Sequence, residues 1–488
     1  MAAKRRNICH HGTAKAKGCS HLRLGKFGRL FDSLAPRALT DDEATLEARA
    51  LGGIGSPMHD ADFSSKDSAL PSGYTFFAQF LDHDITLDTS TELKGSPEAD
   101  VSELPNLRSP SLDLDCVYGF GPEANPHLYD PNAAGRLLEG NSVNPNDVAR
   151  NETGQAQIGD PRNDENLFVS QLQLLFHRFH NRVLDSLVGE TSGERFEEAQ
   201  KKVRHHYQYL VVHDFLCRVC DPDIYKFALG KVERKETYPL LYKRDAHGGL
   251  PMPVEFSVAA YRFGHTLVRS RYAANGKYPD IDLFEESFGT LGFSAVPPEL
   301  TVDWRFLLPV DPCFHALPSK RFDARLADEL IRLPSPVVGR RADDDERSLA
   351  FRNLRRAHVL GLPDGQSVAQ ALKDAGYPIS PSLDLKFTDI EGWDRLDERF
   401  GDSGAGRRRI EKSTPLFFYI LREADLASDG ERLGPVGSAI LLEVLLGILT
   451  FCETSYLHPS QNFELDACIA PNAPKFELAD IVRFVEGG

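Results

Sequence analysis

The sequence predicts a mainly α-helical protein that forms one large domain with little β structure. Three observations lead to this fold class. Apolar residues recur at spacings of three and four in most long segments, which is the period of an amphipathic helix. Alternation of apolar and polar residues, typical of a half-buried strand, is scarce, and no internal repeat is present. The 488 residues, 41% of them hydrophobic, suffice for a large core.

The N-terminal segment, residues 1–45, is basic and is predicted to be a weakly ordered arm. Residues 46–488 are predicted to form the domain. The chain begins MAAKRRNICHHGTAKAKGC, which is basic but lacks the apolar run of a secretory signal peptide. We therefore expect no ordinary signal, and either a cytoplasmic protein or one secreted by another route.

Helical patterns follow one another along the domain. The first covers residues 73–88, and residues 89–165 form a long irregular stretch, rich in Pro, Asn, Gly and Asp, of a kind that is usually functional. Two long amphipathic helices are expected at residues 166–188 and 195–219. Further helical patterns occupy residues 254–270, 322–332, 345–360, 367–375, 414–426 and 434–451.

Charge and apolar length exclude several classes of partner. The net charge of -16 argues against a general nucleic-acid binder and against docking on anionic membranes, because both need a basic surface. The most apolar stretch, SAILLEVLLGILTF at residues 438–451, is shorter than the roughly 18–20 residues of a membrane span. Glu443 also interrupts it, so we expect a buried core helix and no membrane span.

Charged residues interrupt the apolar helix FFAQFLDHDITLD at residues 76–88. Asp82, His83 and Asp84 lie in its middle, although burial of unpaired charges is costly. Successive helical residues point about 100° apart. Asp82 and Asp84 therefore face nearly opposite directions, with His83 between them. The helix could present an acid and an imidazole to one ligand and the second acid to a cation. A buried polar network, or a helix partly exposed here, is the alternative.

A second motif suits a hard cation. SPSLDLDCVYG, residues 109–119, alternates oxygen-bearing side chains, which suits the six to eight oxygen ligands of calcium. The same pattern also fits a plain polar turn. The side chains in question are those of Ser109, Ser111, Asp113 and Asp115.

Two more motifs carry candidate site residues. GDPRNDEN, residues 159–166, leads into a helix that Asn163 is expected to cap. Arg162 and Glu165 are three residues apart and could face one site. YRFGH ends at His265 in an apolar helical setting, where a core histidine is more frequent than a metal ligand.

Five motifs, taken in their order along the chain, resemble the animal-type haem peroxidase family, also called the peroxidase–cyclooxygenase superfamily. They are AQFLDHD, LDLDCVYG, GDPRNDE, YRFGH and NLRRAHVLGLP, the last at residues 353–363. The resemblance covers roughly residues 70–455. It is to bacterial members that have only the catalytic domain. It implies a single helical haem peroxidase domain, with haem b and Ca²⁺ as cofactors.

The resemblance implies roles on the distal side of the haem. His83 would be the distal acid–base histidine and Arg162 the residue that stabilises charge beside it. Gln79 would help to position water or a halide. Asp82 and Glu165 match the carboxylates that esterify haem methyl groups in mammalian members, and the likeness leaves open whether these covalent links form.

The resemblance also implies the proximal side and the metal site. His265 would be the proximal iron ligand, and Asn353 would accept its Nδ1 proton. Arg262 and Arg356 match arginines that hold the haem propionates. Asp115 stands where mammalian members carry a hydroxyl residue, and an additional carboxylate strengthens calcium binding. The implied calcium ligands are Asp84, Ser109, the backbone carbonyl of Ser111, Asp113 and Asp115.

The implied function is the reduction of hydrogen peroxide through an oxidised haem, with oxidation of small donors and a role in the response to oxidative stress. Asn166 stands where myeloperoxidase has a methionine linked to haem. Iodide, bromide, thiocyanate or phenols are therefore expected as donors in preference to chloride. The sequence leaves the oligomeric state open.

Two alternatives remain. The first is a fatty-acid dioxygenase or cyclooxygenase-like enzyme, in which a tyrosine three residues before the proximal histidine forms a radical. Arg262 occupies that position here, and Tyr261 is four residues before His265. The second is an inactive haem- and calcium-binding adhesion module. Retention of His83 and Arg162 speaks against it.

Overall fold

The computed structural model describes residues 25–88, 93, 95, 100–188, 191–285, 289–338, 342–380, 385–401 and 404–487. Over these residues the chain is mainly α-helical, as predicted. The longer helices are α1 Asp41–Gly52, α2 Gly73–Ile85, α4 Leu167–Ser186, α5 Ser192–Leu210, α7 Pro222–Glu233, α10 Leu349–Val359, α11 Gly365–Asp374, α13 Ala405–Lys412, α14 Leu416–Ser428, α15 Pro435–Phe451 and α16 Leu478–Glu486. The short helices are α3 Asp115–Tyr118, α6 Cys217–Val219, α8 Asp328–Ile331, α9 Ser335–Val338 and α12 Leu396–Phe400.

The β structure of the described residues consists of short pairings between segments that are distant in sequence. β1 (Gly25–Gly28) pairs antiparallel with β4 (Pro105–Asn106) and parallel with β5 (Met252–Pro253). The other pairs are β2 (His59–Asp60) with β9 (Leu326–Ala327), parallel; β3 (Asp67–Pro71) with β8 (Pro318–Lys320), antiparallel; and β6 (Arg271–Tyr272) with β7 (Ile281–Asp282), antiparallel. These strands tie loops to the helical body and do not form a layer of their own.

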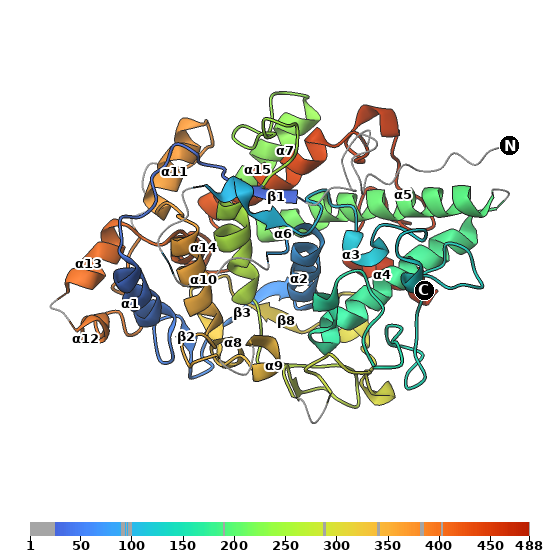
Figure 1. Cartoon of the computed structure of the whole chain (residues 1–488), viewed down its shortest axis with the longest axis horizontal. Helices are drawn as coiled ribbons and strands as arrows, with labels where there is room; N and C mark the ends of the chain where they lie inside the picture. Colours follow the sequence, from blue (N-terminus) through green and yellow to red (C-terminus); the bar gives the residue numbers. More distant parts are fainter. Residues whose placement is uncertain are drawn as a thin grey trace.

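α2 lies near the middle of the molecule and packs on α4 (Figure 1). Its apolar face is buried, as the sequence predicts. Phe76 stacks on Phe168 of α4 with ring centroids 4.8 Å apart, and Phe80 stacks on Phe176 at 4.6 Å. Aromatic pairs of this kind contribute about 0.5–1.5 kcal/mol each beyond their buried area. This packing fixes the orientation of α2, and with it the directions of Asp82, His83 and Asp84.

α15 is the buried core helix expected for residues 438–451. Among the described residues, no helix combines the length and apolar character that crossing a membrane requires. Glu443, in the middle of α15, is buried but well bonded. It accepts hydrogen bonds of 2.8 Å from the backbone N–H groups of Leu240, Leu241 and Tyr242, and one of 2.7 Å from the Tyr377 hydroxyl.

We expect Glu443→Ala to lower the free energy of unfolding by about 3 kcal/mol or more. The substitution leaves three backbone N–H groups without their acceptor, and each such loss costs about 1–3 kcal/mol. Thermal denaturation of the variant beside Glu453→Ala, which truncates an exposed glutamate near the end of α15, measures the effect. Equal midpoints for the two variants would contradict this account of Glu443.

Three predicted helices differ from the structure. Residues 195–219 are continuously helical but contain a π-helix, η4 (Val211–Leu216), between α5 and α6. Residues 254–270, predicted as one helix, form a π-helix, η5 (Glu255–Ala259), followed by a 3-10 helix, η6 (Ala260–His265). The backbone departs from helical geometry at Ala259 (φ -124°, ψ -70°), where the two helices meet, and Arg262 Nε donates to the Ser257 carbonyl at 2.7 Å. Residues 322–332 contain β9 and the short α8, because β9 pairs with the distant β2, and helical periodicity does not report such a contact.

The structure also differs from the predicted arm at residues 25–45. This part contains β1 and the start of α1, and Phe27, Leu30 and Phe31 are buried in the core. The Leu30 N–H donates to Glu255 Oε2 at 2.9 Å, which ties the segment to η5. The basic run that suggested an arm falls mostly in residues 1–24, which lie outside the described residues.

Candidate active site

Eight of the predicted site residues line one cavity of about 330 Å³. They come from α2, from η3 (the 3-10 helix Pro161–Asp164) and the residue after it, from η6, and from α10. A cavity of this size is large enough for a small-molecule ligand. The eight residues are Gln79, Asp82, His83, Arg162, Glu165, Arg262, His265 and Arg356.

His83 is buried, and its ring orientation is fixed from behind. Nδ1 lies 2.7 Å from Asn163 Oδ1, and Nε2 lies 3.9 Å from Glu165 Oε1. Burial, and then the positive charge of Arg162, lower the pKa of His83 to about 4. The imidazole is therefore neutral at pH 7. A neutral imidazole at a cavity wall can accept a proton from a ligand.

Arg162 is held against the C-terminal end of α2. Its Nη2 donates to the backbone carbonyls of His83 (3.2 Å) and Thr86 (2.6 Å) and to Asp160 Oδ2 (2.7 Å). Its Nε donates to Asp160 Oδ1 at 3.1 Å. None of the hydrogen bonds among the described residues uses Nη1, which remains available to a ligand in the cavity. Arg162 is thus a rigidly placed cation beside His83.

Gln79 bridges two neighbours in the same part of the cavity. Its Nε2 donates to Glu165 Oε1, and its Oε1 accepts from Asn166 Nδ2 at 3.2 Å. Burial raises the pKa of Glu165 to about 7, against the opposing effects of Arg162 and the Gln79 hydrogen bond. Glu165 therefore titrates near neutral pH beside His83.

Asp82 and Arg262 form an ion pair at the wall of the cavity. Burial alone would raise the pKa of Asp82, but the charge of Arg262 lowers it below its ordinary value, so Asp82 is ionised. Arg262 Nη1 lies 3.6 Å from Asp82 Oδ2, and the Thr86 hydroxyl donates to Asp82 Oδ1 at 2.9 Å. Burial and the charge of Arg262 also lower the pKa of Arg356. Two mutually repelling guanidinium groups in one cavity favour an anionic ligand such as a carboxylate.

His265 lies at the end of η6, and α10 supplies its partner. Asn353 Nδ2 lies 2.9 Å from His265 Nδ1. Ligation of a metal by Nε2 requires a proton on Nδ1, and rotation of the amide by 180° then brings Oδ1 to Nδ1 as the acceptor. Burial, and then Arg262, lower the pKa of His265 to about 3. The ring is therefore neutral, the form in which histidine binds metals.

Behind α2 the carboxylates of Asp84, Asp113 and Asp115 form a buried acidic cluster, with one ligand oxygen of each within 4.8 Å of the others. Burial and the charge of Asp113 raise the pKa of Asp84 to about 7. Among the described residues Asp84 Oδ1 is buried without a hydrogen-bond partner. Ser109 Oγ lies 3.3 Å from Asp113 Oδ2 and 2.8 Å from Ser111 Oγ. This set of buried oxygen ligands fits a hard divalent cation.

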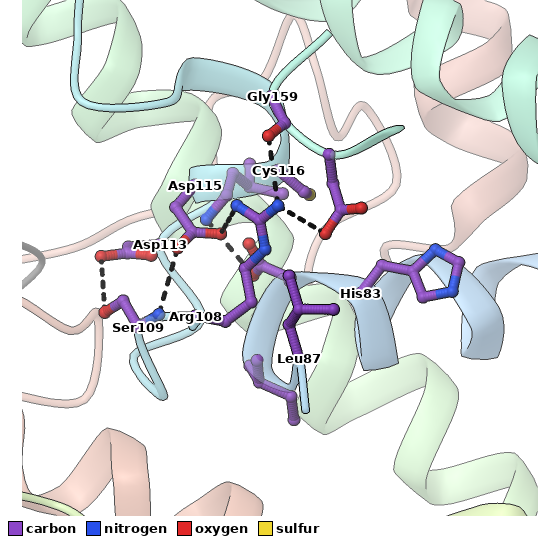
Figure 2. Close-up of polar contacts among 12 residues, drawn as sticks. His83, Leu87, Arg108, Ser109, Asp113, Asp115, Cys116 and Gly159 are labelled. Carbon is purple, nitrogen blue, oxygen red and sulfur yellow. Dashed lines mark hydrogen bonds and ion pairs between the residues drawn. The ribbon is translucent and has the colours of Figure 1, made fainter. Parts of the chain in front are cut away.

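Arg108 connects the acidic cluster to Arg162. Its Nη1 lies 3.5 Å from Asp115 Oδ1, and its Nη2 lies 2.6 Å from Asp160 Oδ2 and 3.2 Å from the Gly159 carbonyl (Figure 2). Burial alone would raise the pKa of Asp160, but Arg162 and Arg108 hold it below its ordinary value. A chain of polar contacts therefore runs from Asp115 through Arg108 and Asp160 to Arg162. Figure 2 shows the His83 ring pointing away from this group.

Sequence reasoning gave no role to Arg108 or Asp160 and the wrong one to Asn163. Asn166, not Asn163, caps α4, because its side chain accepts from the N–H groups of Phe168 and Val169. Asn163 binds His83 instead. Asp160 and Asn163 both lie in GDPRNDE, so the motif marked the region, but the spacing along the chain did not identify their partners.

Two comparisons at the level of sequence give a consistent result. Residues 94–288 match the family model described as animal haem peroxidase. A peroxidase-like protein of Margaritifera margaritifera is 30% identical over 182 residues, which are 34% of this chain and 22% of that protein. The match thus spans less than a quarter of the length of that curated relative.

Solved structures share the fold. Peroxidase A from Dictyostelium discoideum superposes with a TM-score of 0.62 at 16% identity, over 94% of this chain and 93% of that one. The fatty acid alpha-dioxygenase of Arabidopsis thaliana gives 0.58 at 15% identity, over 88% and 73% of the two chains. That of Oryza sativa gives 0.59 at 16% identity, over 93% and 79%. These identities establish a common fold and no more.

Proposed function

We propose that the chain is a member of the animal haem peroxidase family, whose model matches residues 94–288, and that it binds haem b and reduces hydrogen peroxide while oxidising small donors. One observation carries the proposal: two neutral imidazoles, His83 and His265, come from separate segments and line one cavity. The cavity also carries two arginines and two carboxyl groups. This set fits a porphyrin that lies between the imidazoles, with its propionates on the arginines.

The distal residues suit the proton transfers of peroxide reduction. When bound, haem would supply the two-electron reduction of peroxide. His83 Nε2 would take a proton from one peroxide oxygen and return it to the other, which would leave as water. Arg162, through Nη1, stabilises the negative charge that develops on the leaving oxygen. The two electrons that peroxide takes up would be replaced by two phenols, which give one electron each, or by one halide ion, which gives two.

The proximal residues suit the support of the iron. His265 would bind it through Nε2, and Asn353 would accept the Nδ1 proton, which keeps the ring in the required tautomer. An amide is a weaker acceptor than a carboxylate, so His265 would carry less imidazolate character than it would beside an aspartate. Arg262 and Arg356 would bind the two propionates.

The remaining cavity residues bear on attachment and donor choice. The carboxyl groups of Asp82 and Glu165 border the cavity and are candidates for ester links to haem methyl groups. Acid–acetone extraction distinguishes linked from free haem. Asn166 caps α4 and donates to Gln79, and its amide cannot form the sulfonium link of a methionine. We therefore propose iodide, bromide, thiocyanate or phenols as donors.

The test is the absorption spectrum of the purified chain with a pyridine haemochrome assay, before and after addition of hydrogen peroxide. We expect one haem b per chain and a rapid change of the haem absorption band that iodide or a phenol reverses. A chain that binds haem but does not react with peroxide would support the adhesion module instead. A chain that takes up no haem would contradict both functions.

We further propose that the acidic cluster binds Ca²⁺, with Asp84, Asp113 and Asp115 as carboxylate ligands and the Ser109 hydroxyl and the Ser111 carbonyl completing the set. Support comes from the buried Asp84 Oδ1 that lacks a hydrogen-bond partner among the described residues, and from the mutual proximity of three acids. Because Asp84 follows His83 directly, a bound ion would hold the C-terminal turn of α2 in place.

Removal of calcium with EGTA is expected to lower the thermal midpoint of the chain. At a free calcium concentration of 100 times Kd, binding stabilises the folded state by about 2.7 kcal/mol. Asp84→Asn should reduce both the midpoint and its response to calcium, whereas Glu123→Gln, at an exposed position, should change neither. A midpoint that is indifferent to calcium in the unmodified chain would contradict the site.

A second candidate function is fatty-acid oxygenation, and Tyr261 is the residue that favours it. Tyr261 lines the cavity and is buried, and its hydroxyl donates to the Ala78 carbonyl at 3.2 Å. A radical on this ring could reach a ligand in the cavity. Oxygen consumption with linoleate in the absence of peroxide, abolished by Tyr261→Phe, would support this function over the peroxidase.

A further inference from the structure

A continuous chain of hydrogen bonds extends from His83 into the protein interior. His83 Nδ1 lies 2.7 Å from Asn163 Oδ1, and Asn163 Nδ2 lies 2.7 Å from Gln173 Oε1. Gln173 Nε2 lies 2.8 Å from His177 Nε2, and His177 Nδ1 lies 2.8 Å from the Leu138 carbonyl oxygen. The four side chains are 0–6% exposed. None of the three residues behind His83 lines the cavity as described above.

The direction of this chain is fixed at its far end. A backbone carbonyl oxygen can only accept, so His177 Nδ1 donates to Leu138. Burial lowers the pKa of His177, so the ring is neutral and its Nε2 is an acceptor. Gln173 must therefore donate to it through Nε2, and its Oε1 must face Asn163.

A second carbonyl fixes the same direction independently. Gln173 Nε2 also donates to the Cys116 carbonyl at 3.2 Å. If the Gln173 amide were rotated by 180°, Oε1 would face that carbonyl oxygen, and two acceptors would oppose each other in the buried interior. Asn163 therefore donates to Gln173 and presents Oδ1 to His83. Only a donor can satisfy Oδ1, so the proton of neutral His83 lies on Nδ1.

We propose that Asn163, Gln173 and His177 are positioning residues that hold His83 in the tautomer with its proton on Nδ1 and its lone pair on Nε2, facing the cavity. The inference rests on the proposed peroxidase function, because only this tautomer can take a proton from peroxide. The opposite tautomer would point an N–H at the ligand and leave two acceptors opposed at Asn163.

The chain of hydrogen bonds from His83 to His177 also links His83 to the acidic cluster. Gln173 and His177 are four residues apart and lie on the same face of α4. The Cys116 carbonyl that anchors Gln173 follows Asp115 in the chain, so the segment that carries the cluster also fixes the amide. A loss of order in that segment would remove one of the two constraints on the direction of the hydrogen-bond chain.

Two-bond ¹H–¹⁵N correlation spectra of the ¹⁵N-histidine-labelled full chain, without porphyrin, report the tautomer of each imidazole. His83→Ala assigns the His83 signals by their loss. We expect the Nδ1–H tautomer for His83 at pH 7 and a change toward Nε2–H in Asn163→Leu and Gln173→Leu. Asn163→Asp should retain the Nδ1–H tautomer, because its carboxylate accepts from Nδ1 even though Gln173 Oε1 loses its donor. The matched control is Gln171→Leu, which removes a buried glutamine of α4 bonded to Asn146 and Val302.

The second readout is the rate of reaction of the haem-loaded variants with hydrogen peroxide. We expect a decrease of about 10–100-fold in Asn163→Leu, and rates close to that of the unmodified chain in Asn163→Asp and Gln171→Leu. His83 with its proton on Nε2 in the unmodified chain would overturn the inference, and this measurement needs no variant other than His83→Ala, which assigns the signals. If His83 carries its proton on Nδ1 but the haem-loaded protein does not react with peroxide, the proposed function is overturned and the inference about the tautomer stands.

Discussion

His83→Ala is expected to retain haem but to react with hydrogen peroxide about 10²–10⁴-fold more slowly. Positioned general acid–base groups contribute rate factors of this order. Among the described cavity residues, only His83 is a neutral imidazole that lies beside Arg162, whose guanidinium is held against the end of α2. Its removal leaves peroxide binding to iron possible but removes the group that moves the proton between the two oxygens.

Stopped-flow absorption with a fixed concentration of haem-loaded protein and a series of peroxide concentrations gives the second-order rate constant. His127→Ala, an exposed histidine outside the cavity, is the control for the loss of one histidine. A rate constant for His83→Ala within a few-fold of the unmodified chain, with normal haem content, would remove His83 from the mechanism.

His265→Ala is expected to abolish stable haem binding. His265 is the one predicted axial ligand of the iron, so its loss would remove the bond between iron and protein. Arg262 and Arg356 would then hold the haem only by its propionates. Titration of the haem-free chain with haemin, followed by absorption, measures the affinity. We expect a decrease of at least about 100-fold, because loss of a metal ligand exceeds the 10–100-fold effects seen for residues behind the ligands.

Two controls separate ligand loss from general damage. Asn353→Leu removes the partner of His265 and keeps the ligand, so haem should bind with lower affinity and an altered absorption band. Imidazole added to His265→Ala should enter the cavity and partly restore binding. Unchanged haem affinity and spectrum in His265→Ala would show that another residue holds the iron.

The sequence predicted the parts of the site that lie within single motifs. The burial of the apolar face around Asp82, His83 and Asp84 showed that these charges needed compensation, and the structure brings partners to each of them. The alternation from Ser109 to Asp115 predicted a loop that binds a hard cation, and the structure brings Asp113 and Asp115 together with Asp84. Spacing along a helix or loop indicates which neighbouring side chains point to the same side, whereas the bound ion itself stays a prediction.

Residues whose roles depend on distant segments were not predictable in this way. Arg108 meets Asp160 across the fold, and Asn163 meets Gln173 only because α4 begins at Leu167 and turns its buried face toward η3. Asn163 and Asn166 are equally good N-cap residues by type. Their roles differ because the helix starts after Asn166, and helix boundaries are the least certain part of a prediction from periodicity.

The same limit applies to the fold. The apolar period of residues 254–270 is real, but the backbone leaves helical geometry at Ala259 (φ -124°, ψ -70°), the last residue of η5, before η6 begins. Residues 25–45 contain few periodic signals, and they are ordered by strand pairing with β4 and β5, which lie far along the chain.

The most direct test of the central claim is a crystal structure of the chain purified with haem. We expect a porphyrin in the cavity between α2 and η6, with His265 Nε2 bound to the iron and His83 Nε2 above the opposite face, within hydrogen-bond reach of an iron-bound ligand. Iron held by any other residue, or a porphyrin bound outside this cavity, would contradict it.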